Sequence, residues 1–323
     1  MRSTLSLIRR EFTAYFWSPV AYVVLGVFLL ALGLLFHLTV QKLTARGPVG
    51  TEFPMQDLLG NVGFWLIFWI IPPLLTMRMF AEERSTGTLE MLMTAPLRDG
   101  QVVLSKFLAC YLFYALLLLP TLLYLPLLLN LHDAHYHPPE TPWGFTFVAG
   151  LAVLVVGLLW AVVRLGITAF VLVVVGGIAT LAGAWGHYVV DPSPHVFEVA
   201  SGIDPMPLVT SYLGLALAGA MFLALGLWVS SLVRNQLVAA LVALALNLVF
   251  ILGGLLVLGG FVPTPSDTGV FGYRLLAFVS VPLHFSRDFT RGLVDTRHVV
   301  LYVSVTLAGL FLTVRSLESR RWR

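Results

Sequence analysis

Residues 237–262 read LVAALVALALNLVFILGGLLVLGGFV, a run of apolar and small residues that contains no charged side chain. A helix needs about 20 predominantly apolar residues to cross the hydrocarbon core of a bilayer, so this run is long enough to span a membrane. Other uncharged runs on either side of it predict further spans, a pattern typical of a multi-pass helical protein. The predicted spans are residues 20–39, 60–77, 107–129, 145–163, 165–186, 208–232, 237–262 and 299–314.

The composition of the whole chain agrees with this pattern. Of its 323 residues, 59% are hydrophobic and only 11% carry a charge, whereas soluble domains are about one quarter charged. The sequence therefore predicts an all-α polytopic membrane protein.

The two lysines exclude one activity. A Walker A loop needs a Gly-Lys-Ser/Thr sequence, but Lys42 follows Gln41 and Lys106 follows Ser105. The chain therefore has no P-loop with which to bind ATP, and we expect no cofactor of its own.

Basic residues indicate the orientation of the spans, because cytoplasmic segments of membrane proteins retain positive charge. If the N-terminus lies inside the cell, most of the 19 basic residues are cytoplasmic, and both termini lie on that side of the cell's inner membrane. The number of spans must then be even, so we count the fourth and fifth as a pair, although they could also form a re-entrant hairpin. The cytoplasmic set is Arg2, Arg9, Arg10, Arg78, Arg84, Arg98, Lys106, Arg164, Arg234, Arg315, Arg320, Arg321 and Arg323.

Residues 1–19 precede the first span. Apolar residues at spacings of three or four alternate with basic ones, which predicts an amphipathic helix lying on the inner leaflet. Ser18-Pro19 should end it, since proline disfavours helical geometry in the preceding residue. A basic flank that only orients the first span is the alternative. The apolar face of the predicted helix consists of Leu5, Ile8, Phe12, Tyr15 and Phe16.

The loop at residues 78–106 carries the largest group of charges on the cytoplasmic side. Pro72 and Pro73 should kink the span that leads into it, and Gly87 permits a tight turn. Residues 88–94 can form about two helical turns before Pro96. With Leu89 and Leu92 on one side and Glu90 on another, such a helix is suited to contact a protein rather than lipid.

Several segments resemble the permease subunits of ABC-2 type transporters, particularly those associated with gliding motility and with nitrous-oxide reductase maturation. They occur in family order over nearly the whole chain. The matching segments are residues 9–12 (RREF), 18–22 (SPVAY), 74–78 (LLTMR), 82–84 (EER), 87–90 (GTLE), 104–107 (LSKF), 230–236 (SSLVRNQ), 289–297 (FTRGLVDTR) and 317–322 (LESRRW), together with Pro96.

The resemblance implies a type V-like transmembrane domain over residues 20–323 and a function as the permease subunit of an ATP-driven transporter. It also implies two separate ABC ATPase subunits, which would hold ATP and Mg²⁺, and a second permease copy or a paralogue. No nucleic-acid partner is expected. The loop would hold a coupling helix that docks into the ATPase, and the residues implied for docking are Glu82, Glu83, Arg84, Gly87, Thr88, Leu89, Glu90 and Leu92. A solvated charged loop is the alternative.

The chain departs from the family pattern of six spans by fitting eight. The surplus lies between about residues 131 and 201, which we interpret as an inserted two-helix hairpin. The segment 261–298 should form two short helices broken at Pro282 that dip into the outer leaflet, with an amphipathic surface loop as the alternative.

The outer loop contains a histidine cluster, His132, His135 and His137. These side chains are of the right type for zinc or copper, but alternate spacing in an irregular loop does not fix a coordination geometry. A solvated interfacial loop is therefore the preferred interpretation.

Other functions fit the sequence less well. A secondary transporter usually carries charged groups at mid-membrane, whereas the predicted spans contain little beyond Asn247, whose amide suits an interhelical hydrogen bond. An intramembrane enzyme is disfavoured because neither His-Glu-x-x-His nor Gly-x-Ser-x-Gly occurs. A mechanical transmitter that acts on an envelope partner without bulk transport remains an alternative within the same family.

Overall fold

The computed structural model describes residues 2–17, 19–46, 54–88, 98–123, 206–260 and 276–321, with short pieces at 146, 149–150, 153, 172, 175–179 and 182–183. Most of these residues are helical, and no strand occurs among them. The chain divides into two compact units, one of Met1–Leu123 with Asp204–Arg323 and the other of Tyr124–Ile203. The all-α prediction is confirmed.

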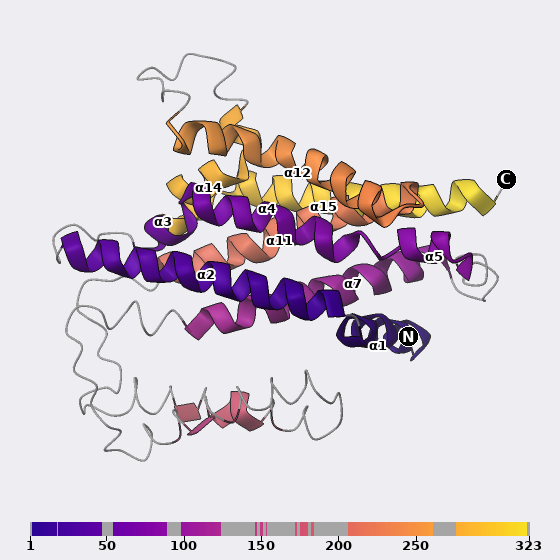
Figure 1. Cartoon of the computed structure of the whole chain (residues 1–323), viewed down its shortest axis with the longest axis horizontal. Helices are drawn as coiled ribbons and strands as arrows, with labels where there is room; N and C mark the ends of the chain where they lie inside the picture. The colour runs from indigo at the N-terminus through magenta and orange to yellow at the C-terminus, as the bar shows by residue number, and fades with distance from the viewer. Residues whose placement is uncertain are drawn as a thin grey trace. The chain divides into compact units, whose positions relative to one another are not determined.

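The first unit contains the helices that correspond to the six family-like spans (Figure 1). Five helices among the described residues are long and apolar enough to cross a membrane, and α4 is shorter at 15 residues. At a rise of about 1.5 Å per residue, α4 alone is about 22 Å long, less than the hydrocarbon core. The bounds are α2 (Pro19–Arg46), α4 (Val62–Thr76), α7 (Asp99–Leu118), α11 (Met206–Leu232), α12 (Gln236–Leu258) and α15 (Thr296–Arg321).

Asparagine side chains begin two of these helices. Asn61 accepts a hydrogen bond of 2.9 Å from the Gly63 N–H at the start of α4, and Asn235 accepts one of 2.9 Å from the Leu237 N–H at the start of α12. Each side chain satisfies a backbone donor that has no partner within its own helix.

Helix α11 packs against α4, α7, α12 and α15 and is buried along most of its length. Glycines permit this close approach. A Cβ atom at Gly219 would collide with the Tyr114 ring of α7, and one at Gly226 with the Thr76 side chain of α4. Small residues let helix backbones approach closely where lipid supplies no hydrophobic driving force.

Aromatic side chains fill the space between α4, α7 and α11. Trp65, Phe68, Tyr114 and Phe222 are fully buried. The Phe68 ring lies 6.2 Å from that of Tyr114 and 5.9 Å from that of Phe222, both edge to face, an arrangement that aromatic rings prefer. This cluster holds α4 in place directly before the charged loop.

Helix α1 (Arg2–Trp17) ends at the residue before Ser18-Pro19, as predicted. It packs on α7, with the Tyr15 ring stacked 4.8 Å from Phe113 and the Phe16 ring 5.8 Å from the same ring. Leu5 of the predicted apolar face is 72% exposed within the chain, as a side chain that faces lipid would be. The position of α1 on the inner leaflet stays a prediction.

The segment before α15 differs from the prediction. Residues 276–279 are helical, Ser280 interrupts them, and α14 (Val281–Arg287) follows with Pro282 in its first turn. Proline therefore begins the second helix rather than breaking it, since its missing N–H needs no partner there. Six residues of α14 are buried, and it packs against α11, α12 and α3 (Pro54–Leu59). Its placement in the outer leaflet stays a prediction.

His284 of α14 is buried among polar partners. Its Nδ1 lies 2.8 Å from the Tyr302 hydroxyl, and its Nε2 lies 3.0 Å from the Ala277 carbonyl oxygen. Burial, and then the nearby His298, lower the pKa of His284 to about 3. The imidazole is therefore neutral, with Nε2 donating to the carbonyl and Nδ1 accepting from the tyrosine.

Two further expectations concern the membrane-spanning part. Asn247 is buried, but its side-chain nitrogen and oxygen have no hydrogen-bond partner among the described residues, so the predicted interhelical bond is wrong. The chain passes through Pro72 and Pro73 within α4 and leaves the helix one turn later. The predicted kink at these prolines stays a prediction.

The second unit, Tyr124–Ile203, covers the residues for which an inserted hairpin was predicted. Its longest described run, residues 175–179, is helical. The two predicted spans at 145–163 and 165–186 otherwise lie outside the described residues and stay predictions.

Candidate functional site

The chain leaves α4 through a turn at Met77–Phe80 and forms the short helix α5 (Ala81–Ser85). Ser230, near the end of α11, holds this turn. Its hydroxyl accepts hydrogen bonds from the backbone N–H of Phe80 at 3.1 Å and of Ala81 at 3.2 Å, and donates to the Met77 carbonyl at 3.3 Å. A hydroxyl offers one donor and two acceptor positions, so this one is fully used.

A second contact joins α5 to α11. The Arg84 guanidinium donates a hydrogen bond of 3.1 Å to the Ser231 carbonyl oxygen. The start and the end of α5 are therefore both fixed to the last turn of α11.

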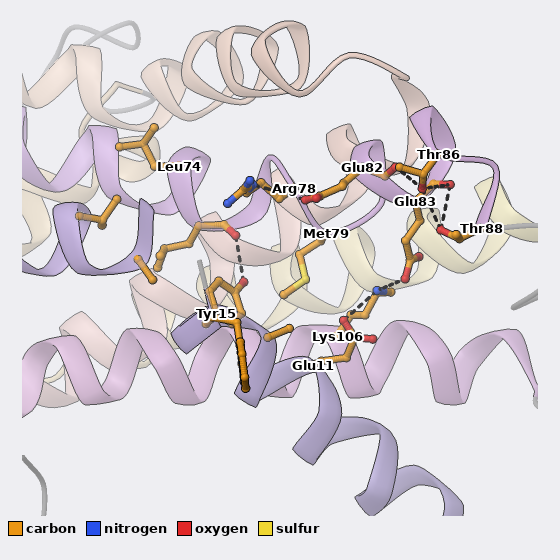
Figure 2. A pocket seen from close by; sticks show the side chains of 15 residues that line it. Glu11, Tyr15, Leu74, Arg78, Met79, Glu82, Glu83, Thr86, Thr88 and Lys106 are labelled. Atoms are coloured by element: carbon orange, nitrogen blue, oxygen red, sulfur yellow. Dashed lines mark hydrogen bonds and ion pairs between the residues drawn. The ribbon is translucent and has the colours of Figure 1, made fainter. Parts of the chain in front are cut away.

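Lys106 of α7 ties three helices together (Figure 2). Its ammonium lies 2.7 Å from the Glu83 carboxylate of α5 and 2.9 Å from the Glu11 carboxylate of α1. The Lys106 side chain is only 2% exposed. Because a buried ammonium needs paired charges to offset its desolvation, both carboxylates are part of the structure that positions α5.

The two carboxyl groups have different electrostatic surroundings. Burial alone would raise the pKa of Glu11, but Lys106 and Arg10 together hold it below its ordinary value of 4.5. Burial raises the pKa of Glu83 above 4.5, and Lys106 offsets this only in part. The difference has a structural cause, since Arg10 bonds directly to Glu11 at 2.8 Å, whereas Glu83 Oε2 accepts no hydrogen bond from the described residues.

Adjacent Glu82 points away from this cluster. Its side chain is 47% exposed and forms an ion pair of 3.4 Å with Arg78, one helical turn earlier. Successive helical residues lie on different faces. Glu83 therefore fixes α5 from inside while Glu82 is presented outward.

The tight turn predicted at Gly87 is confirmed, with a positive φ of 74°. Thr86 and Thr88 follow α5, and their hydroxyl oxygens lie 3.0 Å apart. The Thr86 hydroxyl also donates to the Glu82 carbonyl at 2.9 Å. These bonds fold the chain back at the end of α5.

Of the residues implied for docking, Glu82, Glu83, Arg84, Gly87 and Thr88 come together on and after α5. Leu89, Glu90 and Leu92 lie outside the described residues, so the helix predicted for residues 88–94 stays a prediction. The cluster His132, His135 and His137 also lies outside them. Within the described part of the chain, no group of three or more His, Cys, Asp or Glu residues could hold a metal ion.

Sequence reasoning missed the roles of Glu11, Lys106 and Ser230. It placed Lys106 before the third span, but α7 begins at Asp99 and carries Lys106 inside it. A usable signal was present, because a lysine next to an apolar run needs an acidic partner and Glu11 is the first acid of the chain. Ser230 lies in a segment that carried the family resemblance, but its partners are about 150 residues away in sequence.

Comparison with known proteins supports the resemblance. Residues 36–281, more than half of the chain, match a family model described as ABC-2 family transporter protein. The match includes α4, α5, α7, α11 and α12, and thus most of the site, while Glu11 lies before it. No curated protein matches the sequence significantly.

Proposed function

The chain belongs to the ABC-2 family of transporter membrane proteins, and from this premise we propose that it couples a separate ATPase to substrate movement across the cytoplasmic membrane. As a membrane component of an ABC transporter, it is a multi-pass protein without a catalytic role of its own. Its lysines lie outside any Walker A sequence, so ATP and Mg²⁺ belong to the partner.

The attachment of α5 to neighbouring helices is the observation that supports this proposal. Ser230 and Arg84 attach α5 to α11, and Glu83 attaches it through Lys106 to α7 and α1. A force applied at α5 therefore acts on several helices at once. If two ATPase subunits close on ATP, a helix seated in each can transmit that displacement as a rigid-body movement.

The assembly we propose contains two ATPase subunits and a second permease, either another copy or a paralogue. Both chain termini and α5 lie at the same end of the first unit (Figure 1). This arrangement supports placing that end in the cytoplasm, where an ATPase can reach α5.

The test uses Glu82 rather than Glu83, because replacing Glu83 also breaks the internal pair with Lys106. The tagged full-length chain is purified from its native membrane, and the co-purified chain that carries a Walker A motif is identified and quantified. Glu82→Arg should reduce the recovered ATPase and the coupled ATP hydrolysis. Glu82→Gln, which removes the pair with Arg78 without adding a positive charge, separates these effects.

Glu318→Arg is the matched control, since Glu318 is similarly exposed at 41% and pairs with Arg315 on α15, and neither residue belongs to the site. This variant should recover the ATPase as the wild type does. Absence of any ATPase with the wild type, or unchanged recovery and coupled hydrolysis with Glu82→Arg, would contradict the proposal.

A further inference from the structure

A cavity of about 570 Å³ opens beside α5 (Figure 2). Pockets for small ligands usually have volumes of roughly 300–1,000 Å³, so this one can hold a molecular group. Residues of α1, α2, α4, α5 and α7, and of the turns next to α5, form its walls.

The walls divide into two chemical halves. Ala21 and Val24 of α2 and Leu74 and Leu75 of α4 form an apolar half. The polar half contains Glu11, Arg78, Glu82, Glu83, Thr86, Thr88 and Lys106. Ala21 and Val24 lie in the first two turns of α2, a helix long and apolar enough to span a membrane. The apolar half therefore lies at the membrane end of the cavity, and a matching occupant is amphiphilic.

The charged groups of the polar half are not equally accessible. Lys106 is buried and already bonded to two carboxylates. Arg78 and Glu82 have side chains 35% and 47% exposed, with the Arg78 Nε and a Glu82 carboxylate oxygen 3.4 Å apart. The two most exposed charged side chains of the cavity are therefore one positive and one negative group side by side.

We propose that this cavity binds the head group of an ethanolamine phospholipid drawn from the adjacent leaflet. A guanidinium can donate two parallel hydrogen bonds to a phosphate group, so Arg78 binds the phosphate. The primary ammonium donates hydrogen bonds to Glu82, and the apolar half receives the first part of the acyl chains. A choline head group carries no N–H donor, and a glycerol head group carries no positive charge, so neither fits both residues.

The test of this proposal is independent of the coupling function, because it needs neither an ATPase nor transport. The purified full-length chain is placed in nanodiscs that contain equal amounts of ethanolamine, choline and glycerol phospholipids. Native mass spectrometry then measures which lipid stays bound. We expect the wild type to retain ethanolamine lipid about tenfold more than choline lipid, because loss of a charge-assisted hydrogen bond costs about that factor.

Three variants test the assignment. Arg78→Gln combined with Glu82→Gln should abolish the preference. Arg315→Gln combined with Glu318→Gln removes an exposed helical ion pair elsewhere, of 2.9 Å, and should keep it. Ala14→Trp, at an exposed residue of α1 that lines the cavity, should lower the number of retained lipids and provides the test if the double variant does not fold.

Several outcomes would overturn the proposal: no preference in the wild type, an equal loss in the Arg315/Glu318 control, or unchanged lipid retention in Ala14→Trp. A competition arm uses soluble glycerophosphoethanolamine. If it displaces the lipid at equal concentration, the head group alone is the ligand and the lipid assignment is wrong. If a basic side chain of a protein partner occupies the cavity instead, the purified chain retains no ethanolamine lipid. That result also contradicts the proposal.

Discussion

At the scale of single residues, Lys106 sets the geometry of the site. A buried charge whose partner is removed is left without compensation, so the three groups Glu11, Glu83 and Lys106 depend on one another. The apolar run after Lys106 could be predicted from the sequence, but its two partners, 23 and 95 residues away, could not. Composition and periodicity report local structure, whereas this cluster forms only through tertiary packing.

Lys106→Met tests this dependence. It leaves two partly buried carboxylates without their shared cation, so we expect a loss of roughly 3 kcal/mol in the free energy of unfolding. A lower melting temperature of the purified protein in detergent would show it. The triple variant Glu11→Gln, Glu83→Gln, Lys106→Met should recover much of the loss, and a single variant as stable as the wild type would contradict the buried-pair interpretation.

The two carboxyl groups should respond to pH with opposite signs. The pKa of Glu11 is lowered in the folded state, so its contribution to stability is present above 4.5 and is lost as the pH falls below it. The pKa of Glu83 is raised, so the wild type loses stability as the pH rises through that raised value.

Melting temperatures across a pH series check this prediction. The advantage of the wild type over Glu11→Gln should shrink as the pH falls below 4.5. Its advantage over Glu83→Gln should instead grow toward low pH. Slopes of the same sign for both variants would refute the assigned electrostatics.

At the scale of elements, α11 connects the core to the site. Its glycines admit α4 and α7, and its last turn holds α5 through Ser230 and the Ser231 carbonyl. The sequence predicted α11 within two residues at its start and at its end, because long uncharged runs mark spans well. It placed the start of α7 eight residues too late, because a charged residue inside a helix cannot be distinguished from a loop without knowledge of its partners.

Gly226→Ala tests the contact between α11 and α4. The added Cβ would collide with the Thr76 side chain, whose hydroxyl bonds to the Pro72 carbonyl at 2.9 Å. We expect a destabilisation of about 2 kcal/mol, typical of overpacking, which Thr76→Ala relieves in part. Gly26→Ala on α2 has open space around it and should be tolerated, while additive effects of Gly226→Ala and Thr76→Ala would argue against a direct contact.

At the scale of the whole molecule, the six family-like helices of the first unit return the chain to the end from which it started. The N- and C-termini and α5 share that end, and α3 and α14 lie at the opposite end (Figure 1). The distribution of basic residues predicts an even number of crossings, and termini that share one end of the unit agree with it. Which end faces the cytoplasm follows only from charge and is open to a direct test.

The single cysteine makes that test simple. Cys110 is buried, so it should give little background with a maleimide reagent that does not cross membranes. Thr88→Cys and Ser319→Cys lie at the end that contains α5 and the C-terminus, whereas Thr296→Cys lies at the opposite end of α15, and all three native residues are exposed. In intact cells the reagent should label Thr296→Cys but not the other two, and in inside-out vesicles this pattern should reverse. Labelling of Thr88→Cys from outside intact cells would place α5 beyond the reach of any cytoplasmic ATPase and would refute the coupling proposal together with the topology.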